Sequence, residues 1–289
     1  MTSPLVLAIP TFNCARYLPH TLESLAAQGS AVRWWLQDGA SSDGTAEIAR
    51  RFARHGDTIV SEPDRGQSDA INKAIARMGG EIIGFINGDD CLTPGAAAAV
   101  VETFAAHPEV DLLYGEVEWI DADGAQTGHH KGDISTLEEL LDIYTVWFAA
   151  RQWVQPEVFF RRTLWERAGP LSTGYDLAFD YAFWVQCLLA GARVMRLPMP
   201  LARFRLHDQQ KSANATEAAS EMRDIVRAAL ALDPPISSRA RARITAQLDY
   251  DSYQLAPAPK ASFAGALLRN PSWLRSPAVR DRLRASLHL

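Results

Sequence analysis

The first hundred residues alternate between short apolar runs and longer stretches in which apolar residues recur every three or four positions. The apolar runs predict strands, and they cover residues 5–9, 32–37, 58–61 and 82–86. The recurring pattern predicts helices, and it covers about 15–28, 67–78 and 94–106 together with a segment that begins at 45. This alternation predicts an α/β fold with a largely parallel sheet and helices on both of its faces.

After residue 108 the regular alternation ends. We expect strands at 110–114, 115–120, 126–131, 154–161, 194–197 and 201–206, and helices at about 136–144 and 178–190. From about 214 the chain is rich in Ala and Arg and predicts helices, with proline-containing breaks at 233–235 and 256–259. The pattern therefore divides the chain into residues 1–115, a second region of the same domain at 116–212, and a C-terminal helical extension at 213–289.

Composition narrows the classes of protein. The 289 residues carry 29 Lys and Arg against 34 Asp and Glu, and 47% are hydrophobic. These values exclude a mainly disordered chain and disfavour a dedicated nucleic-acid binder. The three cysteines form no C-x-x-C pair, which argues against a disulfide scaffold or a zinc knuckle. We find no apolar run of membrane-spanning length and no leader pattern at the N-terminus, so we expect a cytoplasmic protein.

Polar clusters follow the predicted strands where their carboxyl ends would lie, which is where open α/β sheets bind ligands. The first cluster is Pro10-Thr11-Phe12-Asn13, and the second begins at Asp38. Asp38 fits either turn chemistry or a hydrogen bond to a base or sugar. In a third cluster, Arg65 fits either a solvated loop or an anion contact at a helix N-terminus.

The fourth cluster, Asn87-Gly88-Asp89-Asp90, follows a strand that is apolar at nearly every position. Asn-Gly is a turn dipeptide, so a plain turn is one interpretation. Two adjacent carboxylates after a buried strand repel each other unless a cation or water neutralises them. Their hard oxygen atoms suit Mg²⁺ or Mn²⁺, and we favour this second interpretation.

Two later residues are candidates for chemistry. Asp180 stands among aromatic residues, where it is either a helix N-terminal charge or a partly desolvated carboxylate suited to general-base work. His207 is a lone histidine, and a surface role is the simpler interpretation for it. No P-loop, G-x-G-x-x-G, H-E-x-x-H or G-x-S-x-G motif is present, which removes support for several large enzyme classes.

Taken together, these segments resemble the family-2 glycosyltransferases of the GT-A fold. The matching blocks occur in order along residues 5–212: Ala8–Asn13, Gln37–Thr45, Ser61–Lys73, Asn87–Asp90, Gln155-Pro156, Phe159–Arg162, Asp180-Tyr181 and Arg205–His207. The resemblance implies an inverting transfer of a sugar from a nucleotide-sugar, usually a UDP-sugar, to an acceptor hydroxyl in polysaccharide or glycoconjugate biosynthesis.

The same resemblance implies a role for each matching position. Residues 1–115 would bind the nucleotide-sugar, and 116–212 would bind a saccharide or glycolipid acceptor. Asp180 would be the catalytic base, Gln155 would contact the acceptor, and Asp89, Asp90 and His207 would hold Mn²⁺ or Mg²⁺. Trp184 is a candidate acceptor contact on other grounds, because an aromatic face can stack on a sugar ring, although tryptophan is also a common core residue. The nucleotide-sugar would contact Pro10, Thr11, Asn13, Asp38, Arg65, Asp69, Asn87, Gly88 and Asp89.

The chain departs from the family pattern at Gln37, Asn87 and Phe179, where many members carry an acidic residue. No Gln-x-x-Arg-Trp motif follows Asp180, so we expect a single addition rather than processive synthesis. Two alternatives remain. One is a non-catalytic subunit that binds a sugar nucleotide. The other is a nucleotidyltransferase, disfavoured because no Gly-rich basic loop follows the first strand.

The C-terminal extension combines arginines with apolar residues at helical spacing. Basic amphipathic helices of this kind bind anionic membranes. They also pack against their own catalytic domain or a second subunit, which we favour. A peripheral membrane contact and a homo-oligomer are both left open by the sequence.

Overall fold

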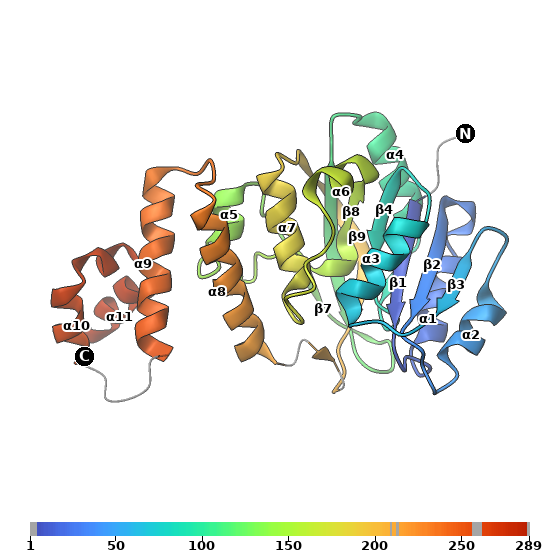
Figure 1. Ribbon diagram of the computed structural model, residues 1–289, viewed down its shortest axis with the longest axis horizontal. Coiled ribbons are helices and arrows are strands. Elements are labelled where there is room, and N and C mark those ends of the chain that lie inside the picture. The colour runs from blue at the N-terminus through green and yellow to red at the C-terminus, as the bar shows by residue number, and fades with distance from the viewer. Residues whose placement is uncertain (1–4, 209, 212–213, 256–261, 288–289) are drawn as a thin grey trace. The chain divides into compact units, whose positions relative to one another are not determined.

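The computed structural model describes residues 5–208, 210–211, 214–255 and 262–287 (Figure 1). The chain divides into two compact units. The first is Met1–Asp133 with Trp153–Glu221, and the second is Ile134–Gln152 with Met222–Leu289. These boundaries differ from those of the three regions expected from the sequence, because Ile134–Gln152 groups with the C-terminal helices. The functions expected of the three regions stay predictions.

One sheet runs through the first unit in the order β3-β2-β1-β4-β8-β6-β9-β5, and β7 pairs with β6. Its strands are β1 (Leu5–Thr11), β2 (Val32–Asp38), β3 (Thr58–Ser61), β4 (Ile82–Phe85), β5 (Cys91–Leu92), β6 (Leu112–Ile120), β7 (Gln126–Lys131), β8 (Val158–Arg161) and β9 (Val194–Arg205). Strands β1 to β4 are parallel, as predicted. Strand β8 runs antiparallel to both β4 and β6, so the second half of the sheet is mixed.

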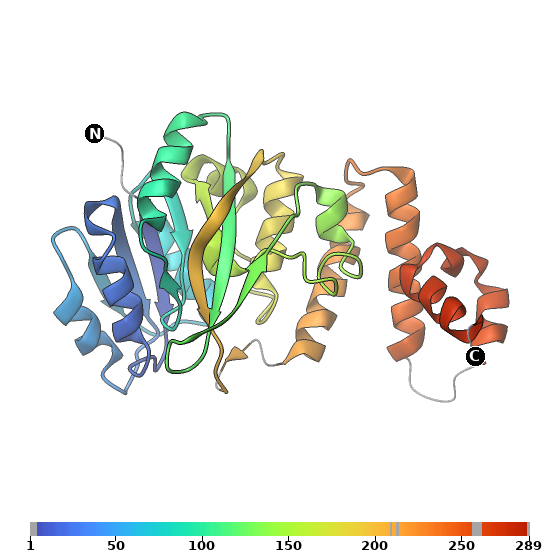
Figure 2. The same cartoon turned by 180° about the vertical axis from the view of Figure 1, so that it is seen from behind.

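Helices cover both faces of this sheet. They are α1 (Leu18–Ala26), α2 (Thr45–Phe52), α3 (Gln67–Arg77), α4 (Ala96–Ala106), α6 (Arg162–Ala168) and α7 (Phe179–Leu189). Helices α3, α6 and α7 lie on one face (Figure 1), and α1, α2 and α4 lie on the other (Figure 2). Apolar residues at helical spacing explain the packing of α1, because Leu18, Leu22 and Leu25 are all buried in the core beneath it.

The structure corrects several predicted elements beyond residue 108. The two strands expected at 110–120 are one strand, β6, and those expected at 194–206 are one strand, β9. Gly115 permits this pairing, because a Cβ there would collide with the side chain of Leu201. Residues 155–157 form a 3₁₀ turn, η2 (Gln155–Glu157), instead of strand, since Pro156 has no N–H to donate to a ladder. Helix α6 was not expected.

The second unit is helical. It contains α5 (Leu137–Leu141), the end of α8 (Ala215–Ala231), α9 (Ser238–Leu255), α10 (Phe263–Arg269), η4 (Pro271–Arg275) and α11 (Pro277–Leu287). Its C-terminal core joins Tyr250 of α9 to Ala266, Trp273 and Val279. The apolar stripe of the extension therefore packs against its own chain, while Leu268 and Leu274 stay exposed. The break expected at 256–259 lies outside the described residues. None of the described helices has the length and apolar character that spanning a bilayer requires.

Two adjacent arginines after β8 tie the sheet to the ends of two helices. Arg161 donates to the carbonyls of Phe104 and His107 at the C-terminus of α4. The Arg162 guanidinium donates to the carbonyls of Ile75, Met78, Gly79 and Gly80 at the C-terminus of α3, over 2.7–3.2 Å. Carbonyls at a helix C-terminus lack intrahelical partners and carry partial negative charge, so the arginines stabilise both ends.

We predict that Arg162→Met lowers the free energy of unfolding by about 2 kcal/mol, because charge-assisted hydrogen bonds to several half-buried carbonyls are lost. Urea unfolding followed by circular dichroism measures the change. Arg50→Met is the matched control. Within the described residues Arg50 forms an exposed ion pair with Glu47 on α2, so its loss should cost no more than about 0.5 kcal/mol. Equal effects of the two substitutions would contradict the role given to Arg162.

Candidate active site

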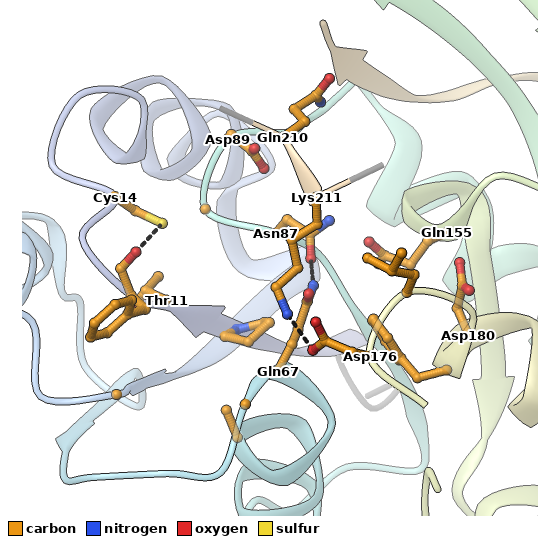
Figure 3. A pocket seen from close by; sticks show the side chains of 18 of the residues that line it. Thr11, Cys14, Gln67, Asn87, Asp89, Gln155, Asp176, Asp180, Gln210 and Lys211 are labelled. Atoms are coloured by element: carbon orange, nitrogen blue, oxygen red, sulfur yellow. Dashed lines mark hydrogen bonds and ion pairs between the residues drawn. The ribbon is translucent and has the colours of Figure 1, made fainter. Parts of the chain in front are cut away.

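A cavity of about 620 Å³ opens at the carboxyl ends of β1 and β4 (Figure 3). The starts of α3 and α7 also border it. Of the residues expected to form a site, those that line it are Pro10, Thr11, Asn87, Gly88, Asp89, Gln155 and Asp180. Among the described residues, those expected at the site but absent from its lining are Asn13, Asp38, Arg65, Asp69, Asp90, His207 and Trp184.

The β1 and β2 ends are held together by Asp38, which is fully buried. Its carboxylate accepts hydrogen bonds from Ser61 Oγ at 2.6 Å, from the Ser41 backbone N–H at 3.0 Å and from Thr11 Oγ1 at 3.3 Å. The Ser41 hydroxyl donates to it as well. Asp38 therefore shapes this end of the cavity from beneath, while the next residue, Gly39, borders it.

Asn13 joins the same two loops from the outside. Its side-chain Oδ1 accepts from the Ser42 N–H at 3.0 Å, and its own N–H donates to Ser41 Oγ at 2.8 Å. The backbone of Asn13 has a φ of 51°, in the left-handed region that Asn tolerates better than most residues. Asn13 thus fixes the loop that carries Pro10 and Thr11 instead of facing the cavity.

The turn after β4 presents Asn87, Gly88 and Asp89 to the cavity. Asn87 accepts from Gln67 Nε2 at 2.6 Å and donates to Asp90 Oδ2 at 3.3 Å. At Gly88 an added Cβ would lie 3.1 Å from Thr11 Cγ2 and 3.2 Å from Cys14 Cβ. The absence of a side chain at Gly88 therefore lets the β4 turn approach the β1 loop closely.

The two adjacent aspartates of this turn have different surroundings. Asp89 keeps 24% of its side chain exposed, and its Oδ2 lies 3.0 Å from His207 Nε2. Asp90 is buried and accepts from the Arg205 N–H at 3.0 Å. Burial, together with the neighbouring Asp89 charge, raises the pKa of Asp90 well above its usual range. Asp89 and His207 can therefore share a cation, whereas Asp90 supports the turn.

Asp180 lies at the side of the cavity opposite Thr11 and Cys14 (Figure 3). It belongs to the first turn of α7, and one carboxylate oxygen accepts from the Tyr181 N–H at 2.7 Å. Burial raises the pKa of Asp180 from 3.8 to about 6. A carboxyl group that titrates near neutral pH can accept a proton from a substrate hydroxyl and release it again.

The two residues expected to contact an acceptor lie differently. Gln155 is buried beside Asp180 and donates to the carbonyl of Phe85, while its Oε1 finds no hydrogen-bond partner among the described residues. Trp184 is fully buried and stacks on Phe85, with ring centroids 5.9 Å apart and an interplanar angle of 10°. Trp184 therefore belongs to the core and has no face to offer an acceptor.

Arg65 and Asp69 form a unit at the start of α3. Arg65 donates to Asp69 from its guanidinium at 2.9 Å and from its backbone N–H at 3.1 Å. The guanidinium hydrogen bond holds the pKa of Asp69 down at about 2. The side chain of Arg65 is 78% exposed, whereas Asp69 fixes the loop that precedes the helix.

Several cavity residues were not singled out from the sequence. They are Phe12, Cys14, Asp64, Gln67, Asp176 and Lys211, among others. For Phe12 the sequence held a signal, because a large aromatic residue stands inside a polar cluster at a strand end. In the structure its side chain is 65% exposed. Lys211 pairs with Asp176 at 2.6 Å. Their sequence neighbours give no pattern that would have joined these two.

The donor set limits how a cation could be held. Within the part of the chain that the structure describes, no three His, Cys, Asp or Glu side chains come together as a complete metal site. Asp89 and His207 supply two ligand atoms 3.0 Å apart. Adjacent ligands of an octahedral Mg²⁺ have about that separation, since each lies about 2.1 Å from the ion. The residues fit a cation whose other ligands come from water and a bound phosphate.

Comparisons with known proteins show the family and the fold of the chain. A family model described as Glycosyl transferase family 2 matches residues 6–164. A PGL/p-HBAD biosynthesis glycosyltransferase of Mycobacterium tuberculosis is 31% identical over 202 residues, which cover 68% of this chain and 74% of that protein.

Two solved structures are similar to the chain in fold. S. aureus TarS in complex with UDP-GlcNAc has a TM-score of 0.66 at 18% identity, and the match covers 93% of this chain and 78% of that chain. The mannosyltransferase PcManGT from Pyrobaculum calidifontis, in complex with GDP-Man and Mn²⁺, has a TM-score of 0.60 at 18% identity, with 94% of this chain and 82% of that chain covered.

The raised pKa of Asp180 predicts a pH-dependent gain of stability in Asp180→Asn. Well below pH 4 the folded and unfolded chains both hold the proton. As pH rises toward 6, the unfolded chain releases it first, so the wild type loses stability that the uncharged Asn retains. At pH 7.5 the variant should therefore be more stable by about 2–3 kcal/mol, with a gain of only about 0.5 kcal/mol at pH 4.

Urea unfolding at the two pH values measures this difference. Asp224→Asn, which replaces a 62% exposed carboxylate on α8, is the control and should show no such gain. If the stability difference between Asp180→Asn and the wild type is the same at pH 4 and pH 7.5, the pKa of the Asp180 carboxyl group is not raised.

Proposed function

The chain belongs to glycosyl transferase family 2 and has the GT-A fold, and on that premise we propose that it transfers a sugar from a UDP-sugar to an acceptor hydroxyl with inversion at the anomeric carbon. The observation that carries the proposal is the shared cavity. It joins the Asn87–Asp89 turn to Asp180, a carboxyl group whose pKa burial raises to about 6.

The donor would occupy the cavity from the β1 end to the start of α3. Pro10 and Thr11 would contact the nucleoside, and Asp38 would act there by holding Thr11 and the loop of Gly39 in place. Gly66 and Gln67 border the cavity at the N-terminus of α3. Backbone N–H groups and the helix dipole at such an end attract phosphate. Arg65, oriented by Asp69, is the cation that we propose for the diphosphate.

The bond changes then follow from where the residues lie. The acceptor oxygen forms a bond to the anomeric carbon from the face opposite the diphosphate, and the bond from that carbon to the diphosphate oxygen breaks. Asp180 takes the acceptor proton, and the nucleoside diphosphate leaves with the bonding electron pair. Proton transfer to a positioned base of this kind typically contributes about 10²–10⁴-fold to the rate.

Mn²⁺ or Mg²⁺ is the cofactor we propose, held by Asp89 and His207. When bound, the cation supplies Lewis-acid stabilisation of the charge that develops on the leaving diphosphate. Asn87 would hold the ribose or a water molecule, and Asp90 would support the turn. The Mn²⁺-bound mannosyltransferase of similar fold supports the choice of a divalent cation.

The acceptor is a saccharide or glycolipid hydroxyl in this proposal. Gln155 has a buried Oε1 beside Asp180 that an acceptor O–H could satisfy. Relatives named for PGL/p-HBAD biosynthesis support a role in glycoconjugate biosynthesis. The single addition, the cytoplasmic location, the peripheral membrane contact and the homo-oligomer stay predictions of the sequence.

The first experiment is a thermal-shift panel of nucleotide-sugars with Mn²⁺. A ligand that binds only the folded chain raises its apparent melting temperature, so the panel selects the donor. Release of the nucleoside diphosphate from that donor is then measured without acceptor. Binding with no release from the native protein would favour the non-catalytic sugar-nucleotide subunit over the enzyme.

We predict that Asp180→Asn lowers turnover of the selected donor by at least about 10²-fold, because no base takes the proton. The Kd for UDP should change by less than about twofold, since the change lies at the side of the cavity away from Thr11. Steady-state kinetics and calorimetry measure the two quantities. Turnover close to that of the wild type would reject Asp180 as the base.

We predict that Asp89→Ala weakens UDP binding in the presence of Mn²⁺ by about tenfold or more, because one of two protein ligands is lost. Without metal, the Kd of the variant and the wild type should agree closely. Asp123→Ala, in the exposed turn between β6 and β7, is the control. An unchanged calorimetric titration with Mn²⁺ would count against a cation at Asp89.

A further inference from the structure

The segment that leads into α7 is held by one side chain from a distant part of the first unit. Glu221, on α8, accepts hydrogen bonds from the backbone N–H groups of Asp176 at 2.9 Å, Leu177 at 2.9 Å and Ala178 at 2.7 Å. Three consecutive N–H groups therefore converge on one carboxylate. Within the described residues, no other side chain accepts hydrogen bonds from all three of these backbone N–H groups.

The local sequence of α7 explains why it needs this partner. The N-cap residue is Ala178, whose methyl side chain cannot accept a hydrogen bond. The first N–H groups of a helix have no intrahelical acceptor and are usually satisfied by Ser, Thr, Asp or Asn at the N-cap. Glu221 instead binds the N–H of Ala178 and those of the two residues before it, and its negative charge complements the helix dipole from outside the helix.

The same segment borders the cavity. Asp176, Leu177, Phe179 and Asp180 all line it, and the first two have their backbone N–H groups on Glu221. Asp180 follows Ala178 by two residues within the first turn of α7. The position of the Asp180 carboxylate in the cavity therefore depends on a backbone that Glu221 holds from behind.

We propose that Glu221 is a positioning residue for Asp180, acting as an external cap that fixes the 176–180 backbone and sets a negative charge behind the base. This inference rests on the proposed function in one respect, which is that Asp180 acts as the base. The hydrogen bonds between Glu221 and the 176–178 backbone are present whatever the function is. Glu221 does not itself line the cavity and, in this proposal, does not touch the substrate.

The charges around Asp180 come from several elements. Asp64, Asp89, Asp176 and Lys211 line the same cavity from the β3–α3, β4–β5, 170–178 and post-β9 segments. Lys211 is paired with Asp176. After burial, the Glu221 charge contributes to raising the pKa of Asp180. Removing that charge should lower this pKa, because the ionised Asp180 would meet less repulsion.

Carboxyl NMR tests this without any substrate. The protein is labelled with ¹³Cγ-aspartate, and the Asp180 resonance is identified by its loss in Asp180→Asn. We expect the apparent pKa of Asp180 to fall by at least half a unit in Glu221→Gln. Glu217→Gln is the matched control, since Glu217 is an exposed residue one turn earlier on α8 that contacts Asn214, and it should leave the pKa unchanged.

Amide hydrogen exchange tests the geometric part. Exchange at 176–178 should become at least tenfold faster in Glu221→Ala than in the wild type, and should stay unchanged in Glu217→Ala. Unchanged exchange and an unchanged Asp180 titration in the folded Glu221 variants would overturn the proposal. If Glu221→Ala does not fold, Glu221→Gln carries both measurements.

Kinetics with the donor selected above separates positioning from a merely structural role. We expect Glu221→Gln to lower kcat about tenfold, to shift the acidic limb of the kcat profile to lower pH, and to leave the donor KM within twofold. A loss of activity that follows loss of folded protein, with an unshifted pH profile, would contradict positioning. Failure of Asp180→Asn to reduce turnover would sink the proposed function and leave the NMR and exchange results interpretable.

Discussion

The site depends on one constraint, which is that carboxylates gather where β1 and β4 end. Parallel strands release their carboxyl ends at the same edge of a sheet, so the loops that follow them must meet there. Asp64, Asp89, Asp176 and Asp180 line the resulting cavity, and Lys211 is the one basic side chain among the described lining residues. A diphosphate would be repelled by such a field, which is the physical reason for expecting a cation to accompany it.

The chain resolves the burial of its aspartates in different ways. Asp38 is surrounded by hydroxyl and N–H donors from Ser41, Ser61 and Thr11, so its charge is fully hydrogen-bonded. Asp90 has two donors and a pKa well above its usual range, because burial and Asp89 disfavour its charge. Asp180 accepts from the Tyr181 N–H, but burial outweighs its hydrogen bonds and raises its pKa to about 6. That value is near the one that base chemistry at neutral pH requires.

The first half of the fold was predictable because its signals are local. Strand β3 has the predicted bounds, and β1, β2 and β4 end within two residues of theirs, since each is a short apolar run between turn residues. From the predicted strand ends we expected Thr11, Asn87 and Asp89 to lie at one edge of the sheet, and all three line the cavity there. Long-range pairing was not predictable, because the antiparallel insertion of β8 and the close approach at Gly115 depend on partners far along the chain. The role of Glu221 was not predictable for the same reason, because its hydrogen-bond partners lie far away in the sequence.

Gln37 and Asn87 are amides at positions where the family resemblance implies acidic residues, and each makes a hydrogen bond that explains its place. Asn87 donates to Asp90 Oδ2 and accepts from Gln67, whereas an aspartate there would place a third carboxylate beside Asp89 and Asp90. Gln37 similarly donates to Glu62 at 3.2 Å, a contact that an acid could make only when protonated. Each amide removes a repulsion and keeps a hydrogen bond. The turn after β4 thereby holds its geometry before any cation arrives, and the charge that remains at Asp89 faces the cavity where a cation would be held.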